Sequence, residues 1–381
     1  MSRLRVNPFY LVVLALLLGL PLVAESETVE AVMPLGLTGP ALLHVFVLIF
    51  FFGFMSQAWN IVGGFAGQLS IGHAAFFGIG AYVSTVCYVQ FGLSPWFGML
   101  VAAAVTGAFG AGLGLVSFHY GLRGPFFALV TVAFAEITRL VLLHWDYVGA
   151  ANGILLPFSP EPTFWQFQFR DKEPYYYIAL VMMLCSIGLV AWIARSRFGY
   201  YLHAIRQDED AAEAVGVPTK RCKIQAIALS AALAGMGGTF YAQYTQYIVP
   251  DDMVVGRVSV EILLGAVIGG AGTVMGPIVG AFILIPVGEA TRVIFEGGGT
   301  GVSLSALIAS DLPFGEKFLT YLDYLAAGGG GGLAIILYGV LLMAVVLGMP
   351  GGVLPWLAGL RKRFGRSADR RADRGTGGSR P

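Results

Sequence analysis

The sequence predicts an all-α membrane protein that crosses the bilayer about ten times, and three observations lead to this fold class. Apolar residues make up 57% of the chain and charged residues only 12%, whereas soluble domains average about 45–50% and about 25%. The mean hydropathy is +0.76. Apolar runs close to the roughly 20 residues that span a bilayer follow one another through most of the 381 residues. They leave no room for a sizeable soluble domain.

Ten apolar runs are candidate membrane spans, and eight to ten crossings are compatible with them. The eighth and ninth runs are short or rich in glycine, so we expect broken or re-entrant helices there. The first run follows Arg3 and Arg5 and precedes the sequence VAES, so it is either a retained span or a signal peptide cleaved after Ala24. The ten runs cover residues 8–24, 41–62, 73–91, 97–118, 125–143, 176–194, 224–248, 260–270, 274–289 and 333–347.

The basic residues indicate the orientation. If the amino end is cytoplasmic, most of the 23 Lys and Arg residues fall on the inner side, in segment 195–223 and in the tail 361–381 above all. The outer connections then hold most of the acids, Asp251 and Asp252 among them. The positive-inside rule therefore places both termini in the cytoplasm if the first span is retained.

The remaining segments indicate how the chain is divided into domains. Residues 1–360 are expected to form one transmembrane domain, and the basic tail 361–381 has too few apolar residues to fold. Residues 296–332 hold two glycine runs around a short amphipathic piece, which predicts an interfacial helix with flexible hinges on the outer side. The three cysteines, Cys87, Cys185 and Cys222, are far apart and indicate neither a disulfide nor a metal site.

Two glycine-rich breaks occur at similar places, one between the second and third runs and one between the eighth and ninth. Small residues let helix backbones approach closely, and broken helices at corresponding places in two halves indicate a pseudo-symmetric transport core. Ordinary glycine packing is the alternative. The glycines concerned are Gly63, Gly64, Gly67 and Gly72 in the first break and Gly269, Gly270, Gly272 and Gly276 in the second.

The most polar part of the chain, residues 195–223, contains the pattern of a short helix over residues 208–216. Acidic residues stand at its amino end, where they complement the helix dipole, and Gly216 and Pro218 end it. The small apolar residues between them leave a surface that the groove of a partner could accept. A solvated charged loop is the alternative.

A family resemblance begins at these residues. Asp210-Ala211-Ala212 followed by Gly216 resembles the E-A-A-x-x-x-G signature of ABC importer permeases, the cytoplasmic helix that docks into the ATPase subunit. Its surroundings, and further blocks along nearly the whole chain, are similar to branched-chain amino acid ABC permeases of the LivM type. The blocks are SRFG (196–199), AIRQDE (204–209), AAEAVG (211–216), GQLSIGHAAFF (67–77), FALVTVAFAEITRL (127–140), SVEILL (259–264), GGAGT (269–273) and LYG (337–339).

The chain departs from the family pattern at two places. The usual T-G-G before N-G in the outer loop after the fifth span reads Val148-Gly149-Ala150 here, which weakens the transfer of substrate identity. The usual R-P-x-G after the last span reads MPGG at residues 349–352, which bears only on how the last helix ends. Asp210 replaces the signature glutamate and keeps its charge.

The resemblance implies one permease of an ABC importer, in the inner membrane of a bacterium. The partners would be a second, shorter permease in a heterodimer, two ATPase subunits, a periplasmic substrate-binding protein and membrane lipid, with no nucleic acid. The chain contains no G-x-x-x-x-G-K-[ST] phosphate loop, so ATP and Mg would bind to the separate ATPase subunits and this chain would need no cofactor and catalyse no reaction. The residues implied in coupling are Arg206, Asp208, Glu209, Asp210, Ala211, Ala212, Glu213 and Gly216.

Ionisable residues inside spans are costly and are usually functional or paired. Glu136 and Arg139 are spaced i, i+3 on a helix and could form a structural ion pair or face a hydrated path for a zwitterion. No second ligand lies at metal-binding spacing from His73, which favours a packing or hydrogen-bonding role over a catalytic one. The candidate path residues are Gln68, Ser70, His73, Glu136, Arg139, Asn152 and Glu261.

Three other functions stay open on the sequence alone. An ion-coupled secondary transporter is also built from repeats and broken helices, but it would not need the acidic helix before Gly216. A membrane-embedded enzyme would need paired catalytic groups, which the sequence does not supply. Permeases for urea or short-chain amides share the ABC architecture, although GAGT (270–273) and the loop from Ser196 are more similar to the amino acid branch.

Overall fold

We analysed a computed structural model of the chain, which describes residues 8–24, 39–157, 163–296, 339–340, 343, 348–349 and 351–356. This part is helical apart from one pair of two-residue strands, β1 and β2, which pair antiparallel with Ile154 opposite Ile248. The tenth predicted span, the outer insertion and the basic tail lie outside the described residues or almost entirely so. The all-α fold class is confirmed for the described part.

The elements follow one another as the apolar runs predict, with short helical turns in the connections. In order they are α1 (Pro8–Ala24), α3 (Gly39–Trp59), the π-helical turn η1 (Asn60–Phe65), α4 (His73–Phe91), α5 (Pro95–His119), α6 (Pro125–His144), the turns η2 (Asp146–Val148) and η3 (Ala150–Asn152), β1 (Ile154–Leu155), the turn η4 (Phe164–Gln166), α7 (Glu173–Arg195), α8 (Arg197–Gln207), α9 (Glu209–Ala214), α10 (Thr219–Thr245), β2 (Tyr247–Ile248), α11 (Pro250–Met253), α12 (Gly256–Gly269) and α13 (Gly276–Glu296).

Six of these helices are long and apolar enough to cross a membrane, so the predicted count of about ten is not confirmed within the described residues. The six segments are Gly39–Phe65, His73–Phe91, Pro95–His119, Pro125–His144, Glu173–Arg195 and Thr219–Thr245, and a shorter apolar helix covers Gly276–Ala290. The eighth predicted run became α12, which at about 1.5 Å per residue is too short to cross a hydrocarbon core of about 30 Å. The seventh run was predicted too long, because its last residues pair as β2 after α10 ends at Thr245.

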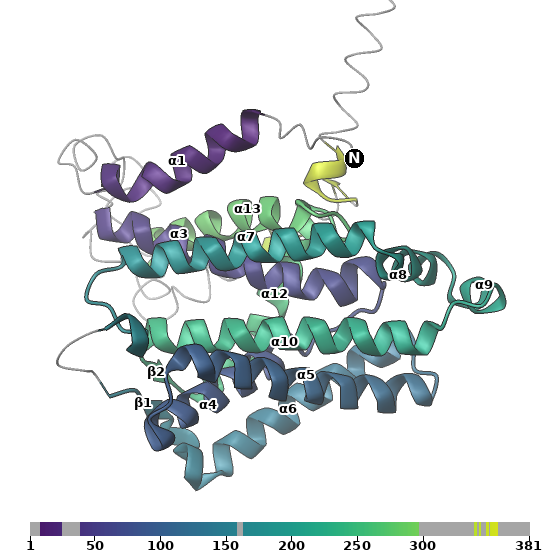
Figure 1. The fold of residues 1–381 in the computed structure, drawn as a ribbon, viewed down its shortest axis with the longest axis horizontal. Helices are drawn as coiled ribbons and strands as arrows, with labels where there is room; N and C mark the ends of the chain where they lie inside the picture. Colours follow the sequence, from purple (N-terminus) through teal and green to yellow (C-terminus); the bar gives the residue numbers. More distant parts are fainter. Residues whose placement is uncertain are drawn as a thin grey trace, which may run out of the picture.

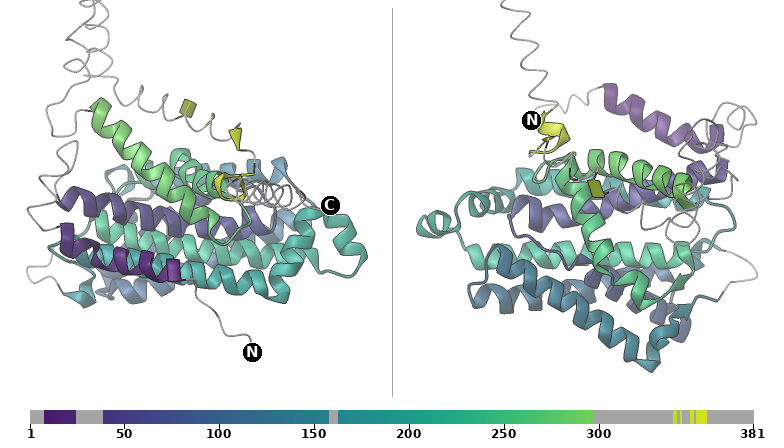
Figure 2. Two further views of the ribbon diagram at one scale, coloured as in Figure 1. Left: turned by 90° about the horizontal axis from the view of Figure 1, so that it is seen from above. Right: turned by 180° about the vertical axis from the view of Figure 1, so that it is seen from behind.

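The long helices lie side by side, with α10 in the middle of the stack between α5 and α4 on one side and α3 on the other (Figure 1). Small residues make this close packing possible. A Cβ at Gly80 would overlap the backbone of Gly235, and one at Gly238 would overlap the backbone of Phe77, so α4 and α10 touch backbone to backbone. Helix α12 runs steeply across the other helices (Figure 2, right). It begins near α4, where Ser259 accepts a hydrogen bond from the Ala74 amide (2.9 Å).

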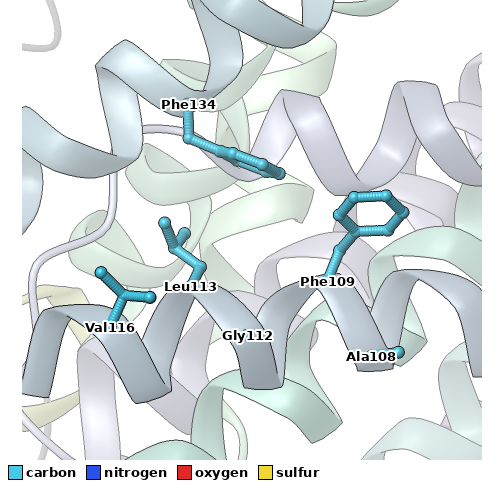
Figure 3. A pocket seen from close by; sticks show the side chains of 6 residues that line it. All are labelled: Ala108, Phe109, Gly112, Leu113, Val116 and Phe134. Carbon is cyan, nitrogen blue, oxygen red and sulfur yellow. The ribbon is translucent and has the colours of Figure 1, made fainter. Parts of the chain in front are cut away.

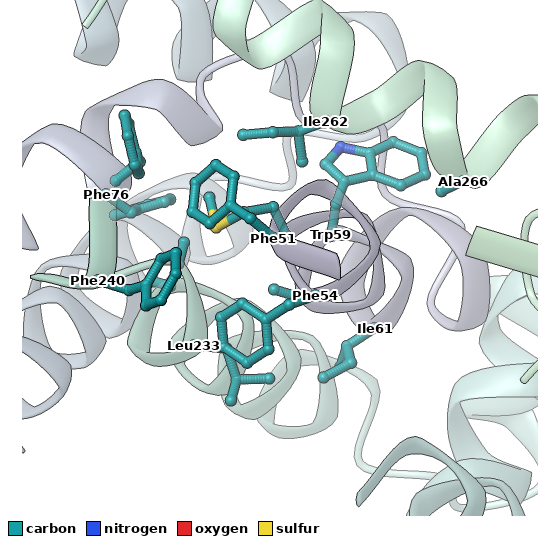
Figure 4. Packing of buried hydrophobic residues seen from close by; sticks show 14 of the residues in the cluster. Phe51, Phe54, Trp59, Ile61, Phe76, Leu233, Phe240, Ile262 and Ala266 are labelled. Carbon is teal, nitrogen blue, oxygen red and sulfur yellow. The ribbon is translucent and has the colours of Figure 1, made fainter. Parts of the chain in front are cut away.

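Aromatic side chains fill the centre, where α3, α4, α10 and α12 meet (Figure 4). Phe51 stacks on Phe240 with ring centroids 5.9 Å apart, and Phe76 and Trp59 are buried in the same cluster. The first helix, α1, is docked on α7 by the Tyr176 hydroxyl, which donates to the Leu17 carbonyl at 2.6 Å. The core is therefore shared by helices from both halves of the chain.

Candidate functional site

The segment between α7 and α10 is a pair of helices, and it projects from one end of the stack (Figure 1). The sequence predicts a loop before residue 208, but residues 197–207 form α8, whose amino end is capped by the Ser196 hydroxyl accepting from the Gly199 amide (3.2 Å). Helix α9 is shorter than the predicted 208–216. Asp208 is its cap, accepting from the amides of Asp210 and Ala211 (both 3.0 Å), and Gly216 follows with φ +89°. Acidic residues at the amino end and glycine at the carboxyl end thus define this helix as predicted.

One face of α9 is held against the membrane domain by charge. Lys223, at the start of α10, is 2% exposed and pairs with Glu209 (Nζ to Oε1, 2.5 Å), while its ammonium lies 4.4 Å from the Phe118 ring centroid. Arg123, in the connection between α5 and α6, pairs with Asp210 (Nη1 to Oδ1, 2.7 Å). The hydrogen bond to Asp210 and the charge of Glu209 raise the pKa of the Arg123 guanidinium above its ordinary value. Two cations therefore fix α9 to α10 and to the α5–α6 connection.

The opposite face of α9 is open. Ala211 and Ala214 are exposed, and Val215 directly after the helix is 81% exposed, whereas Ala212 is buried. Glu213 is exposed as well and accepts a long hydrogen bond from the Thr219 hydroxyl (3.5 Å). The result is a small apolar tip on a charged, anchored helix.

The two glycine-rich breaks contact each other near the carboxyl end of α8. The Asn60 side chain in η1 accepts from the Gly272 amide (2.7 Å) and donates to the Thr273 carbonyl (2.9 Å). A Cβ at Gly64 would overlap both Asn60 and the Gly272 backbone, and Gly272 has φ +83°. The remaining predicted glycines are either closely surrounded or in left-handed conformations: Gly63, Gly67, Gly72, Gly269, Gly270 and Gly276.

Three predicted path residues lie in the packed interior near the first break. His73 is fully buried between the hydroxyls of Ser70 (Nδ1 to Oγ, 2.9 Å) and Ser230 on α10 (Nε2 to Oγ, 2.8 Å). Ser230 in turn donates to the Ala58 carbonyl (2.6 Å), so these bonds join α3, α4 and α10. Gln68 is also buried and donates to the Ala66 carbonyl (3.2 Å). For His73 and Ser70 this geometry is that of hydrogen-bonded packing, whereas the buried Gln68 Oε1 has no hydrogen-bond partner among the described residues.

The predicted pairing of Glu136 with Arg139 is confirmed, and the structure adds a third charge. Arg139 contacts Glu136 (Nη2 to Oε1, 2.6 Å) and also Asp251 of α11 (Nη1 to Oδ1, 2.6 Å). All three side chains are partly exposed, at 25% for Arg139, 52% for Glu136 and 64% for Asp251. The contact with Asp251 could not be predicted from the sequence, because no local spacing joins residues 112 positions apart.

The other two predicted path residues are not part of this ionic chain of Glu136, Arg139 and Asp251. Glu261 pairs instead with Arg257 one turn earlier on α12 (3.4 Å). Asn152 is exposed in the connection between α6 and α7, and its carbonyl accepts from the Tyr247 hydroxyl (3.0 Å). Two residues earlier, Ala150 has φ +45°, a left-handed conformation that favours glycine. The family's second glycine is thus absent at a position whose backbone suits one.

An apolar groove lies between α5 and α6 (Figure 3). It offers no polar side chain to a zwitterion. Among the described residues no group of three or more His, Cys, Asp or Glu side chains could hold a metal ion. The groove is lined by Ala108, Phe109, Gly112, Leu113, Val116 and Phe134.

Six apolar spans and backbone-to-backbone helix packing at glycines define a multi-pass membrane protein. Comparison with known proteins gives the family. The sequence profile of the family described as "Branched-chain amino acid transport system / permease component" matches residues 41–346. The chain therefore belongs to the branched-chain amino acid ABC transporter permeases.

Individual relatives agree with this assignment. The chain is 30% identical to the high-affinity branched-chain amino acid transport system permease protein LivM of Salmonella typhimurium, over 61% of this chain and 59% of the relative. Identity to LivM of Escherichia coli is 29% over the same shares. LivH of Escherichia coli is 23% identical over 61% of this chain and 79% of its own length. The chain thus spans about three fifths of the length of the LivM proteins it matches. No solved structure matches it significantly.

Proposed function

We propose that this chain is a permease subunit of an ATP-driven importer for branched-chain or related hydrophobic amino acids, which a periplasmic binding protein delivers. Helix α9 carries this proposal, because an anchored cytoplasmic helix with an exposed apolar tip is what a force-transmitting contact with an ATPase requires. Two ATPase subunits would bind ATP and Mg, and the chain itself would bind no cofactor. The similarity to both LivM and LivH supports pairing with a second permease of the same family.

The proposed orientation puts both termini and α9 in the cytoplasm of a bacterium, in its inner membrane. Arg123, Arg206 and Lys223 all lie at the α9 end of the stack, which agrees with the positive-inside rule. The coupling residues would then be Arg206, Asp208, Glu209, Asp210, Ala211, Ala212, Glu213 and Gly216, as the sequence implies.

For the translocation path we propose the ionic chain of Glu136, Arg139 and Asp251. An ion pair on the exposed face of a membrane helix is costly against lipid, so this face of α6 is expected to meet water or a protein partner. Carboxylates and a guanidinium offer weak, transient contacts to both ends of a zwitterion. Asn152, Glu261 and Gln68 keep their proposed place near the path, whereas the contacts of Ser70 and His73 favour a packing role.

The test is reconstitution of the chain with its second permease, ATPases and binding protein in lipid vesicles. We expect uptake of leucine that requires ATP and the binding protein. Uptake of urea or acetamide in preference to leucine would transfer the protein to the amide branch. Leucine uptake that persists without ATP, driven by an ion gradient, would contradict the ABC mechanism.

A further inference from the structure

We propose that Arg206 is the positioning residue that couples α8 and α9 to both glycine-rich breaks of the membrane domain at once. The inference rests on the proposed function. It adds to the proposed docking of an ATPase on α9 the place at which a movement of α9 would be transmitted to the helices of the proposed path. Three sets of contacts support it: those of the guanidinium, those between the breaks, and those of α9.

The guanidinium of Arg206 lies where the two breaks meet. Its Nη1 atom donates to the Gly64 carbonyl at 2.5 Å and to the Ala271 carbonyl at 3.2 Å. Gly64 belongs to the π-helical turn η1 that ends α3, and Ala271 belongs to the connection from α12 to α13. One side chain from the cytoplasmic segment thus contacts two carbonyls that are 207 positions apart in the sequence. Charge-assisted bonds of this kind are stronger than neutral ones.

The two breaks are also bonded to each other, so they are expected to move as one unit. Gln57 donates to the Val274 carbonyl (2.6 Å), in addition to the two bonds that Asn60 makes with the second break. No Cβ fits at Gly64 between Asn60 and the Gly272 amide. A displacement of the Arg206 guanidinium would therefore act on the end of α3 and the start of α13 together.

Arg206 is placed to receive motion from α9. It is the penultimate residue of α8, two positions before Asp208, whose extended backbone separates α8 from α9. The first break also lies close to the aliphatic part of the Arg206 side chain, because a Cβ at Gly67 would lie 3.0 Å from the Arg206 Cγ. The ion pairs of Glu209 and Asp210 connect α9 to α10 and to the α5–α6 connection, whereas Arg206 connects α8 to the breaks. A force on the exposed tip of α9 would thus be transmitted to the membrane domain through two sets of contacts.

The experiment compares Arg206→Met and Arg206→Lys in the reconstituted transporter, with Arg197→Met as the matched control at the exposed start of the same helix. We expect Arg206→Met to keep ATP hydrolysis stimulated by the binding protein within about twofold of wild type while leucine uptake falls about tenfold or more. Arg206→Lys should retain more uptake than Arg206→Met, because an ammonium can still donate to both carbonyls. Arg197→Met should behave as wild type.

A second readout requires no transport. Leu69 lies in the first break and is 40% exposed, so a Leu69→Cys variant without the three natural cysteines reports on that break through its rate of maleimide labelling. Adding Arg206→Met should raise this rate in the isolated chain, and Arg197→Met should leave it unchanged.

Wild-type uptake or an unchanged labelling rate in Arg206→Met would overturn the inference and leave the proposed function intact. Equal loss of hydrolysis and uptake, with no rescue by lysine, would also overturn it, since that pattern indicates an assembly defect. If wild-type protein shows no ATP-driven uptake, the proposed function fails, and the labelling rate alone then decides whether Arg206 positions the break.

Discussion

Lys223 is a residue whose charge the fold buries almost completely, and it connects α9 to α10. Its side chain is 2% exposed, and its ammonium lies between Glu209 and the Phe118 ring. Lys223→Met leaves Glu209 with only its longer contact to Arg123 (3.5 Å), so we expect this change to lower the free energy of unfolding by about 1–3 kcal/mol. Thermal unfolding of the purified protein in detergent measures this change.

The matched control for that variant is Lys220→Met, at an exposed position one turn earlier on α10. It should unfold as wild type. The double variant Lys223→Met/Glu209→Gln should recover part of the loss, because the remaining carboxylate is then neutralised. If Lys220→Met and Lys223→Met destabilise the protein equally, the buried pair does not stabilise α9.

Residue types alone could not separate path residues from packing residues. His73, Ser70 and Gln68 stand in a family-like block, and their polarity is compatible with either role. The choice depends on Ser230, 157 positions away on α10, whose hydroxyl meets the His73 ring. The pair of Glu136 and Arg139 could be predicted because its spacing is local, whereas its contact with Asp251 could not.

At the scale of elements, the distinguishing feature of α9 is its exposed face. Ala214 lies on the exposed face, beside Val215. We expect Ala214→Glu to prevent a groove of the ATPase from closing on this tip, so that co-purification of the ATPase subunits falls about tenfold or more. The side chain projects away from the membrane domain, so thermal unfolding of the isolated chain should not change.

Ala214→Ser serves as the control, because it keeps the side chain small and uncharged. It should retain ATPase binding close to that of wild type. Normal co-purification in Ala214→Glu would show that the ATPase binds elsewhere on the chain.

Helices α6 and α11 are joined by charge, and a reversed pair tests what that contact does. In Glu136→Arg/Arg139→Glu the i, i+3 pair within α6 can still form, but a carboxylate now faces Asp251. We expect leucine uptake to fall while the chain still inserts and folds, because only the link to α11 changes sign. Adding Asp251→Arg should restore part of the uptake. Full uptake in the reversed pair would assign these charges no role in the path.

The length of the apolar runs predicted where most helices lie, with α1 and α4 at the observed bounds. They did not predict α8, because its apolar residues Phe198, Leu202 and Ile205 recur at helical spacing on one face and form no continuous run. Nor could they show that α12 crosses the stack as a short helix, since an apolar run of 11 residues does not reveal its direction.

For the whole molecule, the position of the charges predicts which end of the helix stack faces the cytoplasm. Val215 beyond α9 is 81% exposed and Trp165 in the connection before α7 is 68% exposed, at opposite ends of the stack. Cations cluster at the α9 end, and moving them across the bilayer is disfavoured, so that end is expected to stay in the cytoplasm.

In a background without the natural cysteines, a membrane-impermeant maleimide should label Val215→Cys only in inside-out vesicles and Trp165→Cys only in right-side-out vesicles. Labelling of both positions from the same side would contradict the arrangement of helices as spans. The reverse pattern would place α9 outside the cell, where no ATP-driven partner could reach it.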